Sequence, residues 1–229
     1  MQKQKLSDFI AQFLVEQGLQ HVFMLTGGGA MHLNDAFGRH PALEKIYNHH
    51  EQASAMAADS YARISDKIPI VNVTTGPGGI NALNGVFGAW VDSLPMLVIS
   101  GQVKYETTVD STHLPLRQLG DQECRIIEMV KGITKYAVMI TDAQTIKYHL
   151  QKALFLAQHE RPGPVWLDIP MNIQGAYIDP ETLPAFMPES EGYVQPKSMD
   201  DLHITKIYEL LSQAQRPVIL AGAGVRASG

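Results

Sequence analysis

The first 175 residues alternate between two kinds of hydrophobic pattern. Short, nearly continuous apolar runs are typical of buried strands, and apolar residues at helical spacing are typical of amphipathic helices. The predicted strands cover residues 21–25, 44–48, 68–75, 95–100, 135–140 and 164–169. The predicted helices lie near residues 7–18, 31–37, 51–63, 80–92, 123–130 and 142–158. This alternation predicts an α/β fold, a doubly wound parallel sheet with helices on both faces.

Two helix starts carry candidate cap signals. In the first helix Ser7 is a candidate N-cap and Gly18 a candidate C-terminal glycine. Asn48-His49-His50-Glu51 fits a capping box at the start of another helix, in which Asn48 and Glu51 satisfy each other's backbone donors. On this interpretation Glu51 has a structural role only, and the helix dipole also favours an acidic residue there.

The pattern changes after Gly175. Residues 176–198 are rich in proline and acidic residues and show no periodicity, which indicates a linker. Residues 199–229 resume with an amphipathic helix and with "RPVILAGAGV", which predicts a strand followed by a glycine turn. One helix and one strand cannot bury a core, so we expect a first domain over 1–175 and an incomplete second α/β domain over 199–229, within a longer polypeptide.

Composition excludes several classes of function. The formal charge of −5 and the absence of a basic run argue against a nucleic-acid partner. The single cysteine, Cys124, predicts neither a disulfide nor a zinc site, and no other metal-ligand pattern stands out. The N-terminal sequence lacks the apolar core of a signal peptide, and no apolar run is long enough to span a bilayer. We therefore expect a cytoplasmic protein that has no membrane partner.

Three loops that follow predicted strands are candidates for function, because ligands of open parallel sheets bind beyond the carboxyl ends of the strands. They are "TGGGA" at 26–30, "NHHE" at 48–51 and "TTGPGGIN" at 74–81. Taken singly, either glycine loop is better explained as a tight turn between strand and helix. No lysine follows "GPGGIN", so this is no Walker A loop, and the final glycines lack the full spacing of a dinucleotide-binding fold.

Taken together and in order, these segments resemble the N-terminal, pyrimidine-binding domain of thiamine diphosphate-dependent enzymes, specifically the acetolactate synthase-like group. The segments that carry the resemblance are "GGGA" 27–30, "HEQASAMAADSYAR" 50–63, "TTGPGGINALNGVFGAWVDSLPMLVISGQV" 74–103, "QE" 122–123, "ITKYAV" 133–138 and "RPGPVWLDIP" 161–170. Residues 216–225 resemble the first strand of the family's central domain.

The resemblance gives Glu51 a chemical role in addition to its capping role. It implies that Glu51 lies against N1′ of the cofactor's aminopyrimidine and shares a proton there, which promotes loss of the thiazolium C2 proton and decarboxylation of a 2-oxo acid. It also implies that Gln122 reaches the reaction centre. The residues expected to line or brace the pyrimidine pocket are Thr26, Gly27, Gly28, Thr74, Gly76, Pro77 and Asn81.

Two positions depart from the family pattern. Asp121 stands where acetolactate synthases usually have an aromatic residue, and "LTGGG" at 25–29 stands where many members have a proline before two glycines. Both changes make the identity of the substrate uncertain and have less bearing on the identity of the cofactor. We expect His49 and His50 to be solvated turn residues and Cys124 to be a packing residue.

The chain contains no GDG motif, which in this family binds Mg²⁺ and the diphosphate. The resemblance therefore implies that this chain supplies half of an active site, that the other half and the Mg²⁺ belong to a C-terminal domain, and that the protein is at least a homodimer. We expect the chain alone to be inactive and to bind thiamine diphosphate weakly. Whether FAD occupies the central domain is left open.

Three functions remain open from the sequence. The first is a decarboxylase or carboligase acting on pyruvate or a similar 2-oxo acid. The second, prompted by Asp121 and the altered loop, is transfer of a pyruvate-derived acyl group to another acceptor such as a keto sugar. The third is a non-catalytic α/β interaction subunit whose glycine loops are only turns.

Overall fold

The computed structural model describes residues 3–194 and 200–227, and the chain divides into two compact units, one ending at Phe186 and one beginning at Met187. Each unit is described separately. Parts of the predicted domains and linker, namely residues 1–2, 195–199 and 228–229, lie outside the described residues.

The first unit is built on a parallel sheet of six strands. The strands are β2 (His21–Met24), β3 (Glu44–Tyr47), β4 (Ile70–Val73), β5 (Met96–Gln102), β6 (Tyr136–Met139) and β7 (Pro164–Pro170). Their order across the sheet is β3-β2-β4-β5-β7-β6, and every neighbouring pair is parallel. A separate antiparallel pair joins β1 (Gln4–Lys5) to β8 (Tyr177–Ile178).

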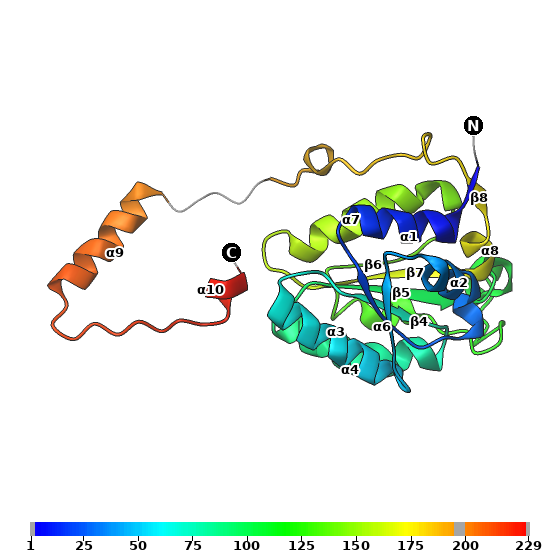
Figure 1. Cartoon of the computed structure of the whole chain (residues 1–229), viewed down its shortest axis with the longest axis horizontal. Helices are drawn as coiled ribbons and strands as arrows, with labels where there is room; N and C mark the ends of the chain where they lie inside the picture. Colours follow the sequence, from blue (N-terminus) through cyan, green and yellow to red (C-terminus); the bar gives the residue numbers. More distant parts are fainter. Residues whose placement is uncertain (1–2, 195–199, 228–229) are drawn as a thin grey trace. The chain divides into compact units, whose positions relative to one another are not determined.

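Helices cover both faces of this sheet, with α1 and α7 on one face and α3 and α4 on the other (Figure 1). The α-helices of the first unit are α1 (Leu6–Glu16), α2 (Met31–Arg39), α3 (Glu51–Ser65), α4 (Pro77–Val91), α5 (Val109–Thr112), α6 (Ile126–Val130), α7 (Ile146–Gln158) and α8 (Met171–Gln174). Short 3-10 turns cover Gly28–Ala30, Tyr105–Thr107 and Ala143–Thr145. The predicted doubly wound α/β fold is confirmed.

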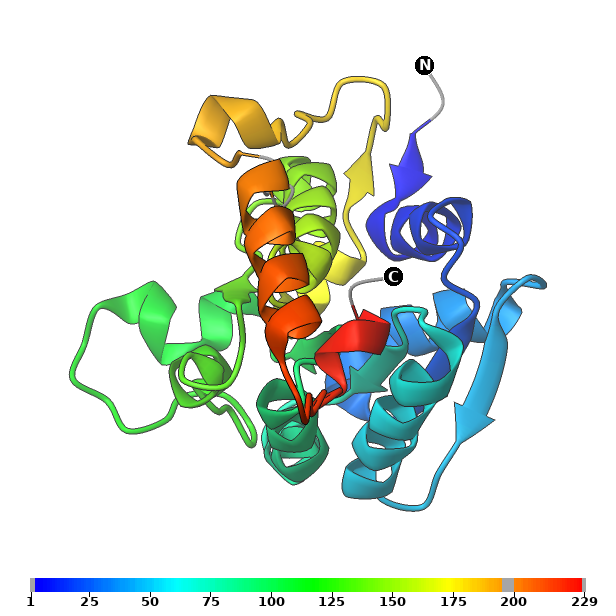
Figure 2. The same ribbon diagram turned by 90° about the vertical axis from the view of Figure 1, so that its left-hand side faces the viewer.

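The two helices α3 and α4 lie side by side against one face of the sheet (Figure 2). The small residues Ala55 and Ala58 of α3 and Ala82 of α4 are fully buried in the core there, together with Trp166 of β7. A Cβ at Gly85 of α4 would lie 2.5 Å from the Cβ of Ala55. The absence of a side chain at Gly85 therefore lets the two helices pack at very short range, which also brings their N-termini together.

The strand order places the glycine loops at a topological switch point. From β2 the chain runs outward to β3 and then returns to β4 on the other side of β2. The loops that follow β2 and β4 are therefore neighbours at the carboxyl edge of the sheet, where α/β folds bind ligands.

Both predicted N-caps are wrong. Ser7 lies inside α1, is fully buried and leaves its Oγ without a hydrogen bond, while Lys5 occupies the N-cap position. At α3 the cap is His50, whose Nδ1 accepts a hydrogen bond from the Gln52 amide at 3.1 Å. Asn48 instead donates to Ser54 Oγ at 3.1 Å, because α3 begins at Glu51, two residues later than a cap at Asn48 requires. Glu51 is thus the first residue of the helix and takes no part in a capping box.

Residues 176–186, which the sequence assigns to a linker, pack on the first unit. They contribute β8, and Leu183 and Phe186 are buried. The Phe186 amide donates to Gln151 Oε1 of α7 at 2.9 Å. The division of the chain into functional domains stays a prediction.

The second unit contains the 3-10 turn Pro188–Glu191, the helices α9 (Asp201–Gln213) and α10 (Gly224–Ala227), and no strand among its described residues. Asp200 caps α9 by accepting from the His203 amide. The predicted strand at 216–220 does not form, because no described segment pairs with it, and Val218 and Leu220 are almost fully exposed.

Candidate functional site

The carboxylate of Glu51 is held at the start of α3, beside the start of α4. Glu51 is 7% exposed, and its Oε2 accepts a hydrogen bond from Asn81 Nδ2 of α4 at 3.0 Å. A Cβ at Gly78 would lie 3.4 Å from Oε1, so that oxygen faces the turn that opens α4. Among the described residues, 3–194 and 200–227, no hydrogen-bond donor is recorded for Oε1. Glu51 therefore presents one fixed and one free carboxylate oxygen at the switch point.

The side chain of Thr74 joins the two glycine loops. Its Oγ1 accepts a hydrogen bond from the Gly29 amide at 3.0 Å. A Cβ at Gly27 would lie 2.5 Å from Thr74 Cβ, and one at Gly78 would lie 2.8 Å from Thr74 Cγ2. A side chain at either glycine would collide with this threonine. Packing against Thr74 therefore requires glycine at both positions, whether or not the turns themselves do.

Two asparagines form a chain of hydrogen bonds that ends at the glycine loop 26–30. Asn34 of α2 donates to the Gly27 carbonyl at 3.1 Å, and Asn72 of β4 donates to Asn34 Oδ1 at 2.8 Å. Asn72 is fully buried in a strand that is otherwise apolar. Neither asparagine was predicted as a site residue, although an asparagine inside a buried apolar run is a sequence signal that identifies Asn72.

The Gly76 turn lies against the backbone of Gln122. Gly76 has φ +59°, in the region that favours glycine, and a Cβ there would lie 2.3 Å from the Gln122 carbonyl oxygen. Gln122 itself has φ +54° and is exposed. The structure thus places the backbone of Gln122 beside the loop after β4 and leaves its side chain accessible. That this side chain reaches the reaction centre stays a prediction.

Glu123 organises the long polar loop that carries Gln122. Its Oε1 accepts from the Val109 amide at 2.7 Å, and its Oε2 accepts from the amides of Leu119 and Gly120 at 2.9 and 3.2 Å. Three backbone donors, one at the start of α5 and two from the loop after it, converge on one carboxylate. In the sequence Glu123 lies at the start of a predicted helix and in the segment "QE" that carries the resemblance, but neither feature predicts these contacts.

A buried polar network lies behind the loops, at the ends of β5 and β7. Asp168 is 2% exposed and accepts from Ser100 Oγ at 2.6 Å and from Gln102 Nε2 at 3.0 Å. Burial raises the pKa of the Asp168 carboxyl to about 7, and the two hydrogen bonds oppose that rise. Trp166 completes the network by donating Nε1–H to Ser100 Oγ at 2.8 Å.

Gln174 of α8 holds the first glycine loop from a distant part of the chain. Its Nε2 donates to the carbonyls of Gly29 and Ile169, both at 2.7 Å, and the side chain is fully buried. No periodicity or motif connects residues so far apart, so only the fold could identify this contact.

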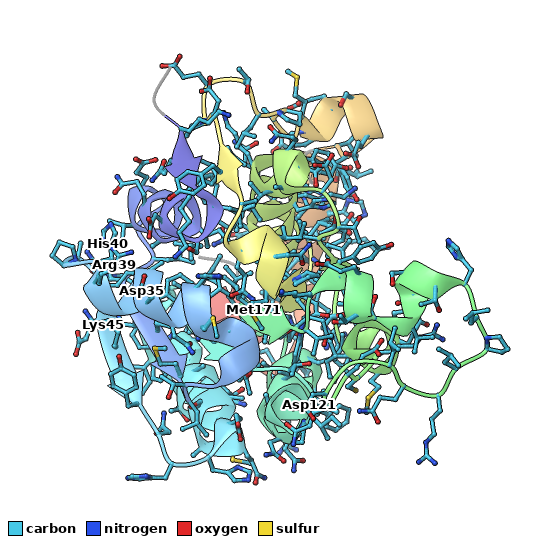
Figure 3. The ribbon with its side chains drawn as sticks, turned by 90° about the vertical axis from the view of Figure 1, so that its right-hand side faces the viewer. Asp35, Arg39, His40, Lys45, Asp121 and Met171 are labelled. Carbon is cyan, nitrogen blue, oxygen red and sulfur yellow. The ribbon has the colours of Figure 1, made fainter. Side chains whose placement is uncertain are left out.

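The remaining predicted site residues lie at the rim of the loops. Thr26, Gly28 and Pro77 are exposed, and His49 is exposed as expected. His50 is also exposed in the turn before α3, as expected, and in addition it caps that helix. Asp121 is exposed. In Figure 3 it lies on the other side of the view from Asp35 and Arg39 of α2, so it is not part of their ion pair, in which Arg39 donates to Asp35 at 2.9 Å.

The arrangement places a carboxylate oxygen without a hydrogen-bond partner among the described residues beside two glycine turns. Such an oxygen can share a proton with a ring nitrogen, and the exposed Gly28 leaves room for a planar heterocycle to approach the backbone. No group of three or more metal-ligating side chains is present in the described part of the chain.

Comparison with known proteins places this geometry in context. Residues 4–129 match the family model described as "Thiamine pyrophosphate enzyme, N-terminal TPP binding domain". The chain is 34% identical over 231 residues to "Acetolactate synthase, chloroplastic" of Arabidopsis thaliana, covering 97% of this chain and 32% of that relative. It is 33% identical over 229 residues to "Acetolactate synthase large subunit" of Buchnera aphidicola subsp. Acyrthosiphon pisum, covering 97% of this chain and 38% of that relative.

The chain therefore spans about a third of the length of the curated relatives it matches. In the part of the chain that the structure describes, none of the helices has the length and apolar character needed to cross a bilayer.

Proposed function

Because the chain belongs to the family of thiamine pyrophosphate enzymes, we propose that it is the pyrimidine-binding part of a thiamine diphosphate-dependent 2-oxo acid decarboxylase or carboligase resembling acetolactate synthase. The observation that carries the proposal is the carboxylate of Glu51, buried at the switch point with Oε2 fixed by Asn81 and Oε1 free. The relatives at 33–34% identity support this activity class.

In this proposal Glu51 holds and releases a proton at the pyrimidine N1′. Asn81 keeps the carboxylate in one orientation, so that Oε1 and not Oε2 meets the ring. Burial excludes water, which would otherwise compete for the proton. When bound, thiamine diphosphate supplies the carbanion chemistry that decarboxylates a 2-oxo acid, while the protein supplies orientation and proton control.

The two glycine loops hold the ring in place. Thr74 fixes the spacing between Gly27 and Gly78, and the exposed backbone of Thr26 and Gly28 forms the rim that the pyrimidine edge contacts. The turn at Gly76 and Pro77 and the accessible side chain of Gln122 would hold the reacting end of the cofactor. The roles of Thr26, Gly27, Gly28, Thr74, Gly76, Pro77, Asn81 and Gln122 are part of the proposal.

The diphosphate and Mg²⁺ belong to a second domain in this proposal. The chain has no GDG motif, and the relatives are about three times as long. We place the missing half of the site on another subunit, which makes the active protein at least a homodimer in the cytoplasm. Whether FAD binds to the central domain depends on sequence outside the first unit.

The test is turnover by the holoenzyme, meaning this chain together with its diphosphate-binding domain. Glu51→Gln keeps the shape and the hydrogen bond from Asn81 and removes the basic oxygen, so consumption of pyruvate should fall by about 10²–10⁴-fold. The matched control is Glu128→Gln, since Glu128 is also a first-turn glutamate but is exposed. Equal activity of the two variants would refute the role of Glu51.

The identity of the product decides between two acceptors. Acetolactate as product supports the leading proposal. Asp121, exposed beside Gln122 where acetolactate synthases usually have an aromatic residue, favours a more polar acceptor. Transfer of the acyl group to a keto sugar in place of pyruvate would establish the second candidate function.

A further inference from the structure

The end of β5 contains a buried amide whose hydrogen bonds connect two loops. Gln102 is 3% exposed. Its Oε1 accepts from Thr75 Oγ1 at 2.5 Å and from the Val103 amide at 3.0 Å. Its Nε2 donates to the Cys124 carbonyl and to Asp168 Oδ2, both at 3.0 Å. A primary amide has two N–H donors and two acceptor lone pairs, so every polar position of Gln102 is used.

The orientation of this amide is determined by backbone groups. The Val103 N–H can only donate and the Cys124 carbonyl can only accept, so the oxygen and nitrogen of the side chain cannot be exchanged. Asp168 must then accept from Gln102, and Ser100 supplies the donor to its other oxygen. The amide and the carboxyl group form a rigid unit at the ends of β5 and β7.

The two loops that this unit joins are those that meet at the site. Thr75 directly precedes Gly76, and Cys124 follows Gln122 by two positions. The backbones of Gly76 and Gln122 lie so close that a Cβ on Gly76 would be 2.3 Å from the Gln122 carbonyl oxygen. One side chain therefore holds both partners of this contact.

We propose that Gln102 is a positioning residue for the reaction, fixing the separation between the Gly76 turn and the Gln122 loop. This inference rests on the proposed function, because only that function makes the two loops part of an active site. Gln102 contacts neither Glu51 nor the rim of the site by any recorded hydrogen bond, so it acts only through the loops. Displacement of a reacting group by about 1 Å can reduce a rate by about 10²-fold. A side chain that keeps the two loops at a fixed separation can therefore affect the rate without touching the reacting groups.

Hydrogen–deuterium exchange of the 229-residue chain, without cofactor, tests the brace directly. Gln102→Met keeps the length of the side chain and removes all four hydrogen bonds. The amides of Gly78 and Glu123, each bonded within its own loop, should exchange at least about tenfold faster, since a lost hydrogen bond is worth roughly 1 kcal/mol and several are lost. The amides of α1 should change much less.

Ser100→Ala is the matched control. Ser100 lies two residues earlier on β5 and also binds Asp168, but no recorded bond joins it to either loop. It should leave exchange at Gly78 and Glu123 within about twofold of the unchanged protein, whatever its effect on global stability. Equal acceleration by both variants, or none by Gln102→Met, would overturn the proposal.

A second, milder variant keeps the test informative if Gln102→Met fails to fold. Thr75→Val removes one bond of the brace with little change in shape, and it should accelerate exchange at Gly78 but not at Glu123. In the holoenzyme Gln102→Met should lower kcat more than it raises KM. Failure of the proposed function would show as unchanged turnover in Glu51→Gln with the exchange results intact, so the two failures are distinguishable.

Discussion

At the scale of single residues, the two oxygens of Glu51 have different surroundings. Asn81 occupies Oε2, while Oε1 faces the turn at Gly78. A carboxylate with both oxygens bonded would be a structural brace, and one with both oxygens in water would be an ordinary surface charge. The asymmetry at Glu51 suits a group that must keep its orientation while a proton moves.

Asp168 makes stability depend on pH in an unusual direction. Its folded pKa of about 7 lies above the ordinary value of 3.8 because the carboxyl group is buried. Between these values the folded protein keeps a proton that the unfolded chain has lost. The resulting stabilisation is complete below the unfolded pKa and is lost as the pH rises through about 7.

Asp168→Asn should remove this pH dependence. The free energy of unfolding of the unchanged protein, relative to the variant, should fall between about pH 4 and about pH 8 by on the order of 4 kcal/mol at most. Urea unfolding at several pH values measures it. Ser100 and Gln102 bond to Asp168. The ionisable side chains that line the cavity beside it are Asp110, Glu123, Cys124, Arg125 and Glu128, and both proteins contain all of these groups. A difference in stability that does not change with pH would contradict the assignment.

The sequence predicts individual residues only where a local signal exists. Glu51 and the loop glycines could be predicted because each follows a predicted strand. The contacts of Gln102 and Gln174 could not, because their partners lie far along the chain. Ser7 and Asn48 show the opposite error, in which a residue type suited to a cap lies near a helix start but outside the N-cap position.

At the scale of elements, the packing of α3 on α4 sets the position of Glu51. Both helices begin at the site, and their close approach at Gly85 and Ala55 brings Glu51 within hydrogen-bond distance of Asn81. The sequence predicts both helices. It does not predict that they pack against each other, since this depends on the order of the strands beneath them.

Gly85→Ala should therefore destabilise the protein, although alanine is the better helix former. The new Cβ would lie 2.5 Å from Ala55, so the helices must separate, at a cost of about 1–3 kcal/mol. Gly88→Ala is the matched control on the same helix, because the nearest atom to its Cβ is 3.8 Å away. That variant should gain roughly 0.5–1 kcal/mol. Thermal unfolding measures both, and a stabilised Gly85→Ala protein would show that the helices can separate freely.

The predicted strand at 216–220 shows a limit of element prediction. Its composition suits a strand, but a strand also needs a hydrogen-bonded neighbour, and the described residues provide none. The six strands of the parallel sheet were predictable to within a few residues because each has partners in the same unit. The short strands β1 and β8 of that unit were not predicted.

At the scale of the whole molecule, the proposed pyrimidine site lies in the first unit, and the sequence contains no GDG motif for a diphosphate. The chain matches about a third of the length of each relative. The parallel order of strands was predictable from the alternating pattern. The meeting of the loops after β2 and β4 was not, because it follows from the position of the switch point.

The 229-residue chain alone should bind thiamine diphosphate weakly, even with Mg²⁺ present. Most of the affinity for a doubly charged diphosphate should come from metal and backbone donors that this chain lacks. Calorimetry measures this, and the expected dissociation constant is above about 1 mM, equivalent to less than about 4 kcal/mol of binding free energy. Micromolar binding would show that the chain contains a complete cofactor site.

Exchange of the C2 proton of bound thiamine diphosphate tests the central claim most directly, because it reports proton control without requiring a substrate. The measurement compares the holoenzyme with its Glu51→Gln and Glu128→Gln variants by NMR after mixing with heavy water. The account predicts that exchange slows by about 10²-fold or more in Glu51→Gln and is unchanged in Glu128→Gln. Exchange in Glu51→Gln at the rate of the unchanged enzyme would contradict it.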